Sequence, residues 1–107
     1  MAVQIQFANL HCNSTDDSST DEIFVKWAGN RIWGPTEMSE GSVVNVDKFV
    51  LLQGDSGLVE LFDEDWPSDD HLGGYRITKN ELGGPWRSAK FKNEDADYDL
   101  WYRVFEG

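Results

Sequence analysis

Apolar and polar positions alternate along most of this chain, beginning within its first ten residues. The period of two is visible over residues 3–7, returns over residues 23–27 and is longest over residues 98–105. Alternation of this kind is typical of strands that are buried on one face. A helical period is not kept over three turns anywhere, and only a single turn is expected, near residues 79–82. The pattern therefore predicts an all-β chain.

Turn-forming residues divide the alternating pattern into about eight short strands. Gly34-Pro35 is expected to end the third strand, and the fourth is expected to bend at Asp47. Many short strands separated by frequent turns favour an antiparallel β-sandwich of eight strands, in one domain spanning residues 1–107. The expected strands are residues 3–10, 23–27, 31–33, 44–52, 59–61, 75–78, 88–92 and 98–105.

The composition indicates a folded domain with an acidic surface. Hydrophobic residues make up 39% of the 107 residues and aromatic residues 13%, which is enough to bury a core. Twenty Asp and Glu against nine Lys and Arg give a formal net charge of −11. This charge opposes binding to nucleic acid and direct binding to anionic lipid. A phosphate surface would have to be approached through a cation.

Other features bear on the compartment and on catalysis. Cys12 is the only cysteine, so no intrachain disulfide can form. The first residues lack the regions of a signal peptide, and no apolar run approaches about 20 residues, so we expect a soluble protein, cytoplasmic or exported without a conventional signal. His11 and Cys12 are neighbours on a strand and point to opposite faces, which argues against a nucleophile–base pair. We expect a protein that is not an enzyme.

The acidic residues are concentrated most strongly in residues 63–70, where five acids surround Trp66. Carboxylates this close repel by about 1 kcal/mol per pair in water, and by more where solvent is partly excluded. A cation among them would remove this repulsion. Calcium is the natural candidate, because it takes roughly six to eight oxygen ligands in tolerant geometry.

The acids are also sorted between the two ends of the expected sandwich. If consecutive strands run antiparallel, residues 16–22, 63–70 and 94–97 emerge at the same end, whereas the opposite end carries only Asp55 and Glu81. Solubility alone does not require such sorting, although a solvated acidic rim is the alternative interpretation. The sorting indicates a cation site assembled from more than one loop.

Two of these acidic segments resemble the calcium-binding loops of C2 domains, the calcium-dependent phospholipid-binding β-sandwiches. Residues 63–73 look like the third loop of that family. Residues 16–26 are similar to its first loop, with an early Asp and a later Asp followed by an aromatic residue, valine and lysine. The resemblance spans roughly residues 5–78 and implies the permuted topology, in which the first loop joins the first two strands. The family's usual proline in the first loop is absent, and the third loop is shorter than its commonest form.

The resemblance also implies a ligand set. Asp63 and Asp65 would be the central ligands, and Asp70 matches the terminal ligand of the third loop. The first loop would close the site through one of its early acids and one of its later acids, and the sequence leaves both choices open. The candidate calcium ligands are Asp16 or Asp17, Asp21 or Glu22, and Asp63, Asp65, Asp69 and Asp70.

Trp66 and Pro67 stand at the apex of the third loop, between ligand candidates. In the C2 family, apolar residues at loop tips enter the lipid interface, where an indole is favoured, and Met38 is expected to do the same from the middle loop. The alternative is that Trp66 folds back over a neighbouring loop as a lid. An exposed row among the remaining tryptophans would instead favour sugar stacking, but these are expected to be sheet residues: Trp27, Trp33, Trp86 and Trp101.

The expected function is therefore that of a calcium-binding module that docks reversibly to membranes through its acidic loops and Trp66. The alternative is a calcium-stabilised adhesion, carbohydrate-binding or assembly module that does not bind lipid. Both hypotheses require calcium, and they differ in the partner.

Overall fold

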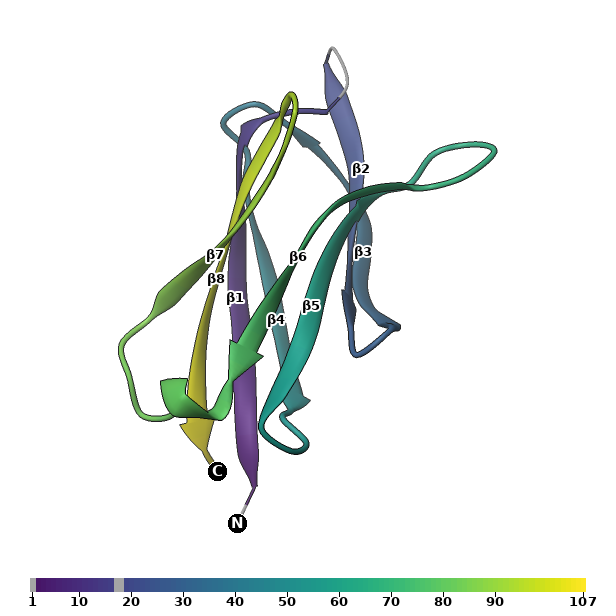
Figure 1. Ribbon diagram of the computed structural model, residues 1–107. Coiled ribbons are helices and arrows are strands. Elements are labelled where there is room, and N and C mark those ends of the chain that lie inside the picture. The colour runs from purple at the N-terminus through teal and green to yellow at the C-terminus, as the bar shows by residue number, and fades with distance from the viewer. Residues whose placement is uncertain (1, 17–18) are drawn as a thin grey trace.

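The computed structural model describes residues 2–16 and 19–107, and this part of the chain forms eight strands in two four-stranded sheets (Figure 1). One sheet has the order β4-β1-β8-β7, the other has the order β3-β2-β5-β6, and all neighbours within the sheets are antiparallel. The elements are β1 (Val3–Ser14), β2 (Thr20–Trp27), β3 (Asn30–Ser39), β4 (Val43–Leu51), β5 (Ser56–Asp63), β6 (Asp70–Thr78), the single turn η1 (Lys79–Glu81), β7 (Arg87–Asn93) and β8 (Ala96–Glu106). The predicted eight-stranded antiparallel sandwich is confirmed.

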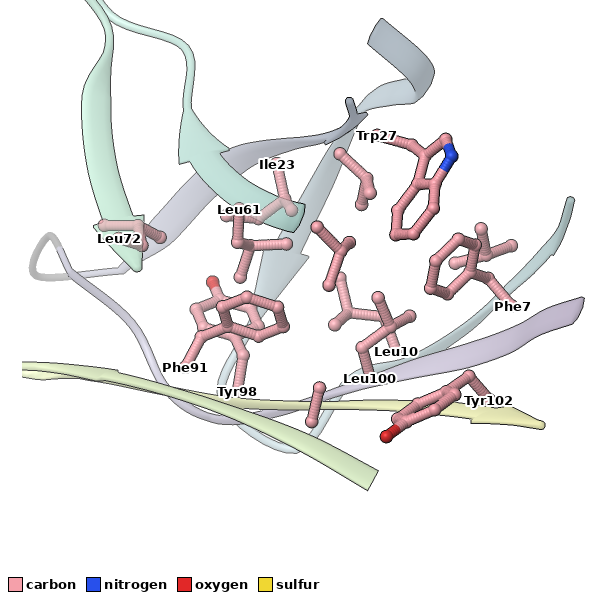
Figure 2. Packing of buried hydrophobic residues seen from close by; sticks show 14 of the residues in the cluster. Phe7, Leu10, Ile23, Trp27, Leu61, Leu72, Phe91, Tyr98, Leu100 and Tyr102 are labelled. Atoms are coloured by element: carbon pink, nitrogen blue, oxygen red, sulfur yellow. The ribbon is translucent and has the colours of Figure 1, made fainter. Parts of the chain in front are cut away.

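The core lies between the two sheets and is built from the alternation seen in the sequence. Along β8, every second residue from Ala96 to Val104 is buried, and the residues between them are partly exposed. Figure 2 shows side chains of both sheets pointing into this space, among them Phe7, Leu61 and Tyr102. The Phe7 and Trp27 rings, from opposite sheets, lie 6.0 Å apart between centroids. The strand period therefore determines which residues form the core.

The sequence predicted an irregular backbone at two positions, and the structure confirms only one of these predictions. Asp47 has a φ of +49°, and the pairing of β1 with β4 shifts its register opposite this point, so the predicted bend is confirmed. The predicted strand end at Gly34-Pro35 is wrong, because β3 continues to Ser39. Since β3 is an edge strand and its register against β2 shifts beside these residues, it accommodates a proline without ending.

The sixth strand is longer than its sequence indicates. The prediction placed its start at residue 75, but β6 begins at Asp70, because Gly73 and Gly74 pair with β5 rather than forming a turn. The third-loop acids therefore occupy the end of β5, the connecting residues 64–69 and the start of β6.

The loops that carry the acids share one end of the sandwich. The end of β1, the start of β2 and the connection from β7 to β8 lie at the top of Figure 1, the connection from β5 to β6 projects to the right from the upper half, and both termini lie at the bottom. The first loop joins the first two strands, as the permuted topology requires. Among the described residues, no helix has the length and the apolar character of a membrane span.

Gly34 and Gly29 provide a test of the packing beneath β3. Both have a left-handed φ, but a Cβ at Gly34 would lie 2.4 Å from the Ile23 carbonyl oxygen, whereas a Cβ at Gly29 would have nothing within 4 Å. Gly34→Ala should therefore lower the free energy of unfolding by about 3–5 kcal/mol, and Gly29→Ala by about 1–2 kcal/mol. Urea denaturation of both variants measures the difference. Equal losses would contradict the close packing at Gly34.

Candidate metal centre

Strand pairing brings the first and third loops together. Ile23 of β2 lies opposite Asp63 of β5, and Asp63 lies opposite Asp70 of β6. Beyond the paired residues, the Glu64 amide donates to the Glu22 carbonyl at 2.7 Å, and the Glu22 amide donates to Asp63 Oδ1 at 2.8 Å. The acids at the ends of these strands are therefore neighbours because of the register of the sheet.

Three of the candidate ligands meet at this point. Oxygen atoms of Asp16, Asp63 and Asp70 all lie within 4.8 Å of one another, and they form the one such group of acids, histidines or cysteines found among the described residues. Asp63 is 2% exposed, Asp16 is half-buried and Asp70 is exposed. Because calcium–oxygen distances are about 2.4 Å, two oxygens on one ion lie at most about 5 Å apart. The donor set and its spacing fit a single calcium ion.

The side chain of Asp21 is hydrogen-bonded to the backbone of the first loop. It is 1% exposed, and its Oδ2 atom accepts hydrogen bonds from the Asp16 amide at 2.8 Å and from the Tyr98 hydroxyl. Glu22, the next residue on the strand, has an exposed side chain, and its backbone groups make the contacts with β5 described above. Of the two alternatives for the later acid of the first loop, the structure therefore places Asp21 beside Asp16.

Tyr98 is a positioning residue that the sequence did not single out. Burial, and then the hydrogen bond to Asp21, raise the pKa of its hydroxyl far above the usual range, so it stays protonated and donates. The only signal in the sequence is a tyrosine at an inward position, since a buried hydroxyl requires a partner. Burial likewise raises the pKa of the Cys12 thiol, which lowers its nucleophilicity at neutral pH.

Asp65 and Asp69 lie further out along the third loop. The Asp65 amide donates to Asp69 Oδ1 at 3.2 Å, and the Trp66 amide donates to Asp65 Oδ1 at 2.9 Å. Both carboxylates are exposed, and neither belongs to the group of three. Asp17, the other candidate of the first loop, lies outside the described residues. The roles of Asp65, Asp69 and Asp17 as ligands stay predictions.

The third acidic segment, residues 94–97, is partly neutralised by lysines of the neighbouring strand. Lys90 Nζ lies 2.7 Å from Asp97 and 3.1 Å from Asp99, and Lys92 Nζ lies 3.7 Å from Asp97. The hydrogen bond from Lys90 holds the pKa of Asp97 below its usual value. Ion pairing with lysines therefore accounts for Asp97 without a metal ion.

Trp66 lies at the surface of the protein. Its side chain is 84% exposed and Pro67 is also exposed, which contradicts the alternative of a lid over a neighbouring loop. The prediction that Met38 contributes an apolar loop tip is wrong, because Met38 is 1% exposed and occupies an inward position of β3, opposite Asp21. The error follows from ending the third strand too early.

The remaining tryptophans separate into two groups. Trp27, Trp33 and Trp101 lie within strands β2, β3 and β8, as predicted. Trp86 does not lie within a strand, because β7 begins at Arg87, and it is 44% exposed. The loop after η1 carries it to the surface rather than into the sheet.

Comparison with known proteins supports the fold. No protein-family model matches the chain, and no curated protein matches it. A solved structure titled "Structure of a C2 domain" matches with a TM-score of 0.64 and 14% identity over 97% of each chain.

Two further structures match as parts of longer chains. A structure of CC2D1B matches 96% of this chain with a TM-score of 0.65 and 7% identity. The calcium-bound C2A and C2B domains of Extended-Synaptotagmin 2 also match 96% of this chain, with a TM-score of 0.55 and 19% identity. This chain spans 53% and 44% of their respective lengths. The strand order, the joining of the first two strands by the first acidic loop, and these similarities together identify the chain as a divergent domain of the C2 fold.

Proposed function

We propose that this domain binds calcium at its acidic end and that the bound ion attaches it reversibly to a phospholipid surface. The observation that supports the proposal most is the meeting of Asp16, Asp63 and Asp70, which come from two separate loops, within 4.8 Å. A calcium-bound structure among the matches, Extended-Synaptotagmin 2, agrees with this choice of ion. Asp21 and Asp65 are proposed as further members of the site.

Electrostatics favours a cation at this point of the molecule. Two carboxylates at 4 Å repel by about 4 kcal/mol at the effective dielectric constant of a protein surface, compared with about 1 kcal/mol in water. Asp63 is almost fully buried, so water screens its charge poorly. A divalent ion removes this repulsion, and its binding free energy adds to the stability of the fold.

The same ion would provide the contact with phosphate. Three protein carboxylates occupy fewer than the roughly six to eight positions of a calcium ion, and water or phosphate oxygens can occupy the others. The formal net charge of −11 opposes direct contact with anionic lipid. Calcium would therefore act as the bridge between an acidic protein and an acidic surface.

Trp66 is the exposed aromatic residue of the third acidic loop. It lies in the connection between Asp63 and Asp70, which extends away from the sandwich in Figure 1. An exposed indole is favoured at the boundary between headgroups and acyl chains. Insertion of Trp66 would add an apolar contact to the ionic one, so that lipid binding depends on both.

Calcium should raise the melting temperature of the protein, and Asp70→Asn should reduce this effect. At a hundred times Kd, binding stabilises the folded state by about 2.7 kcal/mol, which corresponds to a rise on the order of 10 °C. Differential scanning calorimetry with calcium or EDTA measures it. Asp55→Asn, an exposed acid at the opposite end, is the control and should keep the full shift. An unchanged melting temperature of the wild-type protein in millimolar calcium would refute the proposal.

Tyr98→Phe should weaken calcium binding, because the hydroxyl holds Asp21, which in turn holds the backbone of Asp16. Tyr102→Phe is a matched control, since Tyr102 is equally buried and its hydroxyl donates to Glu81 of η1, away from the acidic loops. Both variants should lose about 1–3 kcal/mol of stability. Only Tyr98→Phe should raise the Kd for calcium in isothermal titration calorimetry, by about tenfold. Equal Kd values would remove the positioning role of Tyr98.

Trp66→Ala should weaken lipid binding without changing calcium binding. We expect the wild-type protein to sediment with vesicles of phosphatidylserine and phosphatidylcholine in calcium but not in EDTA. Loss of the indole should lower the vesicle affinity about tenfold, or about 1.4 kcal/mol. Trp86→Ala, which changes an exposed tryptophan on another surface, is the control. A calcium-dependent melting shift without sedimentation would favour the module that binds calcium but not lipid.

A further inference from the structure

A second surface of the molecule carries exposed aromatic side chains, away from the acidic loops. It is the outer face of the sheet β4-β1-β8-β7. Because Tyr98, Leu100 and Tyr102 of β8 point into the core, Trp101 and Phe105 lie on the outer face of the same strand. Phe49 of β4 is 56% exposed, and its ring contacts that of Phe105 with centroids 6.1 Å apart. Trp86 adds a further exposed ring just before β7.

Two of these rings border a hollow. Trp86 and Trp101 line it together with Ala8, Asn9 and His11 of β1, and its volume is about 330 Å³. The pairing of β1 with β8 places Asn9 opposite Trp101. The His11 and Trp101 rings lie 6.3 Å apart between centroids and are inclined at 54°. The hollow therefore combines two indoles with one amide and one imidazole.

Contacts around the hollow hold its walls in place. His11 Nε2 and Asn9 Oδ1 are hydrogen-bonded at 2.9 Å. The Arg103 guanidinium lies 5.2 Å from the centroid of the Trp86 ring, and Arg103 Nε donates to Gln6 Oε1 at 2.9 Å. A cation over one indole and a hydrogen bond on the polar side restrict the rotamers of these residues. A ligand would meet a surface that needs little rearrangement, which favours affinity.

The lining residues limit the class of ligand. Small-molecule sites are mostly apolar and aromatic with a few polar groups that fix orientation, and this hollow has that composition. Nucleobases also stack on indoles, but their phosphates would be repelled by a chain of net charge −11. A proline-rich peptide presents carbonyl acceptors, whereas Asn9 and His11 offer both donors and acceptors. Hydroxyl groups match both functions, and the C–H face of a sugar ring matches an indole.

We propose that the hollow bordered by Trp86 and Trp101 binds a neutral saccharide. One sugar ring would lie on an indole face, with its hydroxyl groups hydrogen-bonded to Asn9 and His11. The lining residues all lie outside the acidic loops, so binding at this face does not require calcium. The site is thus separate from the one proposed for calcium and lipid, and an experiment that refutes one of the two proposals leaves the other standing.

The test is a titration of the full chain, in EDTA, with neutral hexasaccharides of glucose, mannose, xylose, galactose and N-acetylglucosamine. Isothermal titration calorimetry should detect saturable binding of at least one of them. Trp86→Ala should raise the Kd at least about tenfold. Trp66→Ala, which removes a more exposed tryptophan from the acidic end, should leave the Kd unchanged.

Folding controls accompany this titration. Trp86 lies outside the strands, so Trp86→Ala should keep the wild-type melting temperature, and Trp101→Phe keeps an aromatic ring where alanine would disturb β8. Absence of binding by all five hexasaccharides would overturn the proposal. Binding that is lost in Trp66→Ala but kept in Trp86→Ala would also overturn it, as would binding of a polyproline peptide at the hollow in preference to every saccharide.

Discussion

The register of β2, β5 and β6 is the constraint on which the acidic end depends. Inward residues such as Val25 and Leu61 are fully buried, and their burial fixes how these strands pair. A slip of one residue would turn Asp63 to the outer face and separate it from Asp16. The geometry of the carboxylates is therefore a consequence of the apolar core, and the loops themselves do not have to specify it.

Placing acids at the end of a core has a cost, and the structure shows how it is offset. Burying a carboxylate is unfavourable unless hydrogen-bond donors replace the lost water. Asp63 accepts from the Glu22 amide, and Asp21 accepts from the Asp16 amide and the Tyr98 hydroxyl. The same hydrogen bonds that reduce the cost fix the carboxylates in position. A site of this kind gives up some stability in exchange for a preformed arrangement of ligands.

The sequence predicted an element well where buried and exposed residues alternate regularly along it, and poorly elsewhere. Strand β8 was predicted closely because every second residue is buried. The extent of β3 was not predicted, because a proline in an edge strand resembles the end of a strand. Met38, which lies beyond that proline, was therefore assigned to a loop instead of to β3. Acids at the ends of paired strands, such as Asp63 and Asp70, could be placed together from topology. The loop at Asp65 has no repeating pattern from which its path could be predicted. The hollow beside Trp86 could not be predicted either, because it depends on contacts between residues distant in sequence.

Strand β8 links the two proposed sites, and its alternation also keeps them apart. Tyr98 points inward and supports the acidic loops through Asp21, whereas Trp101 points outward and borders the aromatic hollow. A ligand on the outer face would change no contact beneath the loops unless the register of β8 moved. That register is held by antiparallel pairing with β1 along a ladder from Val3 to Ser14. A rigid strand of this kind favours independent binding. One end of the sandwich and one of its faces could then be occupied at the same time, so that a membrane and a saccharide would not compete.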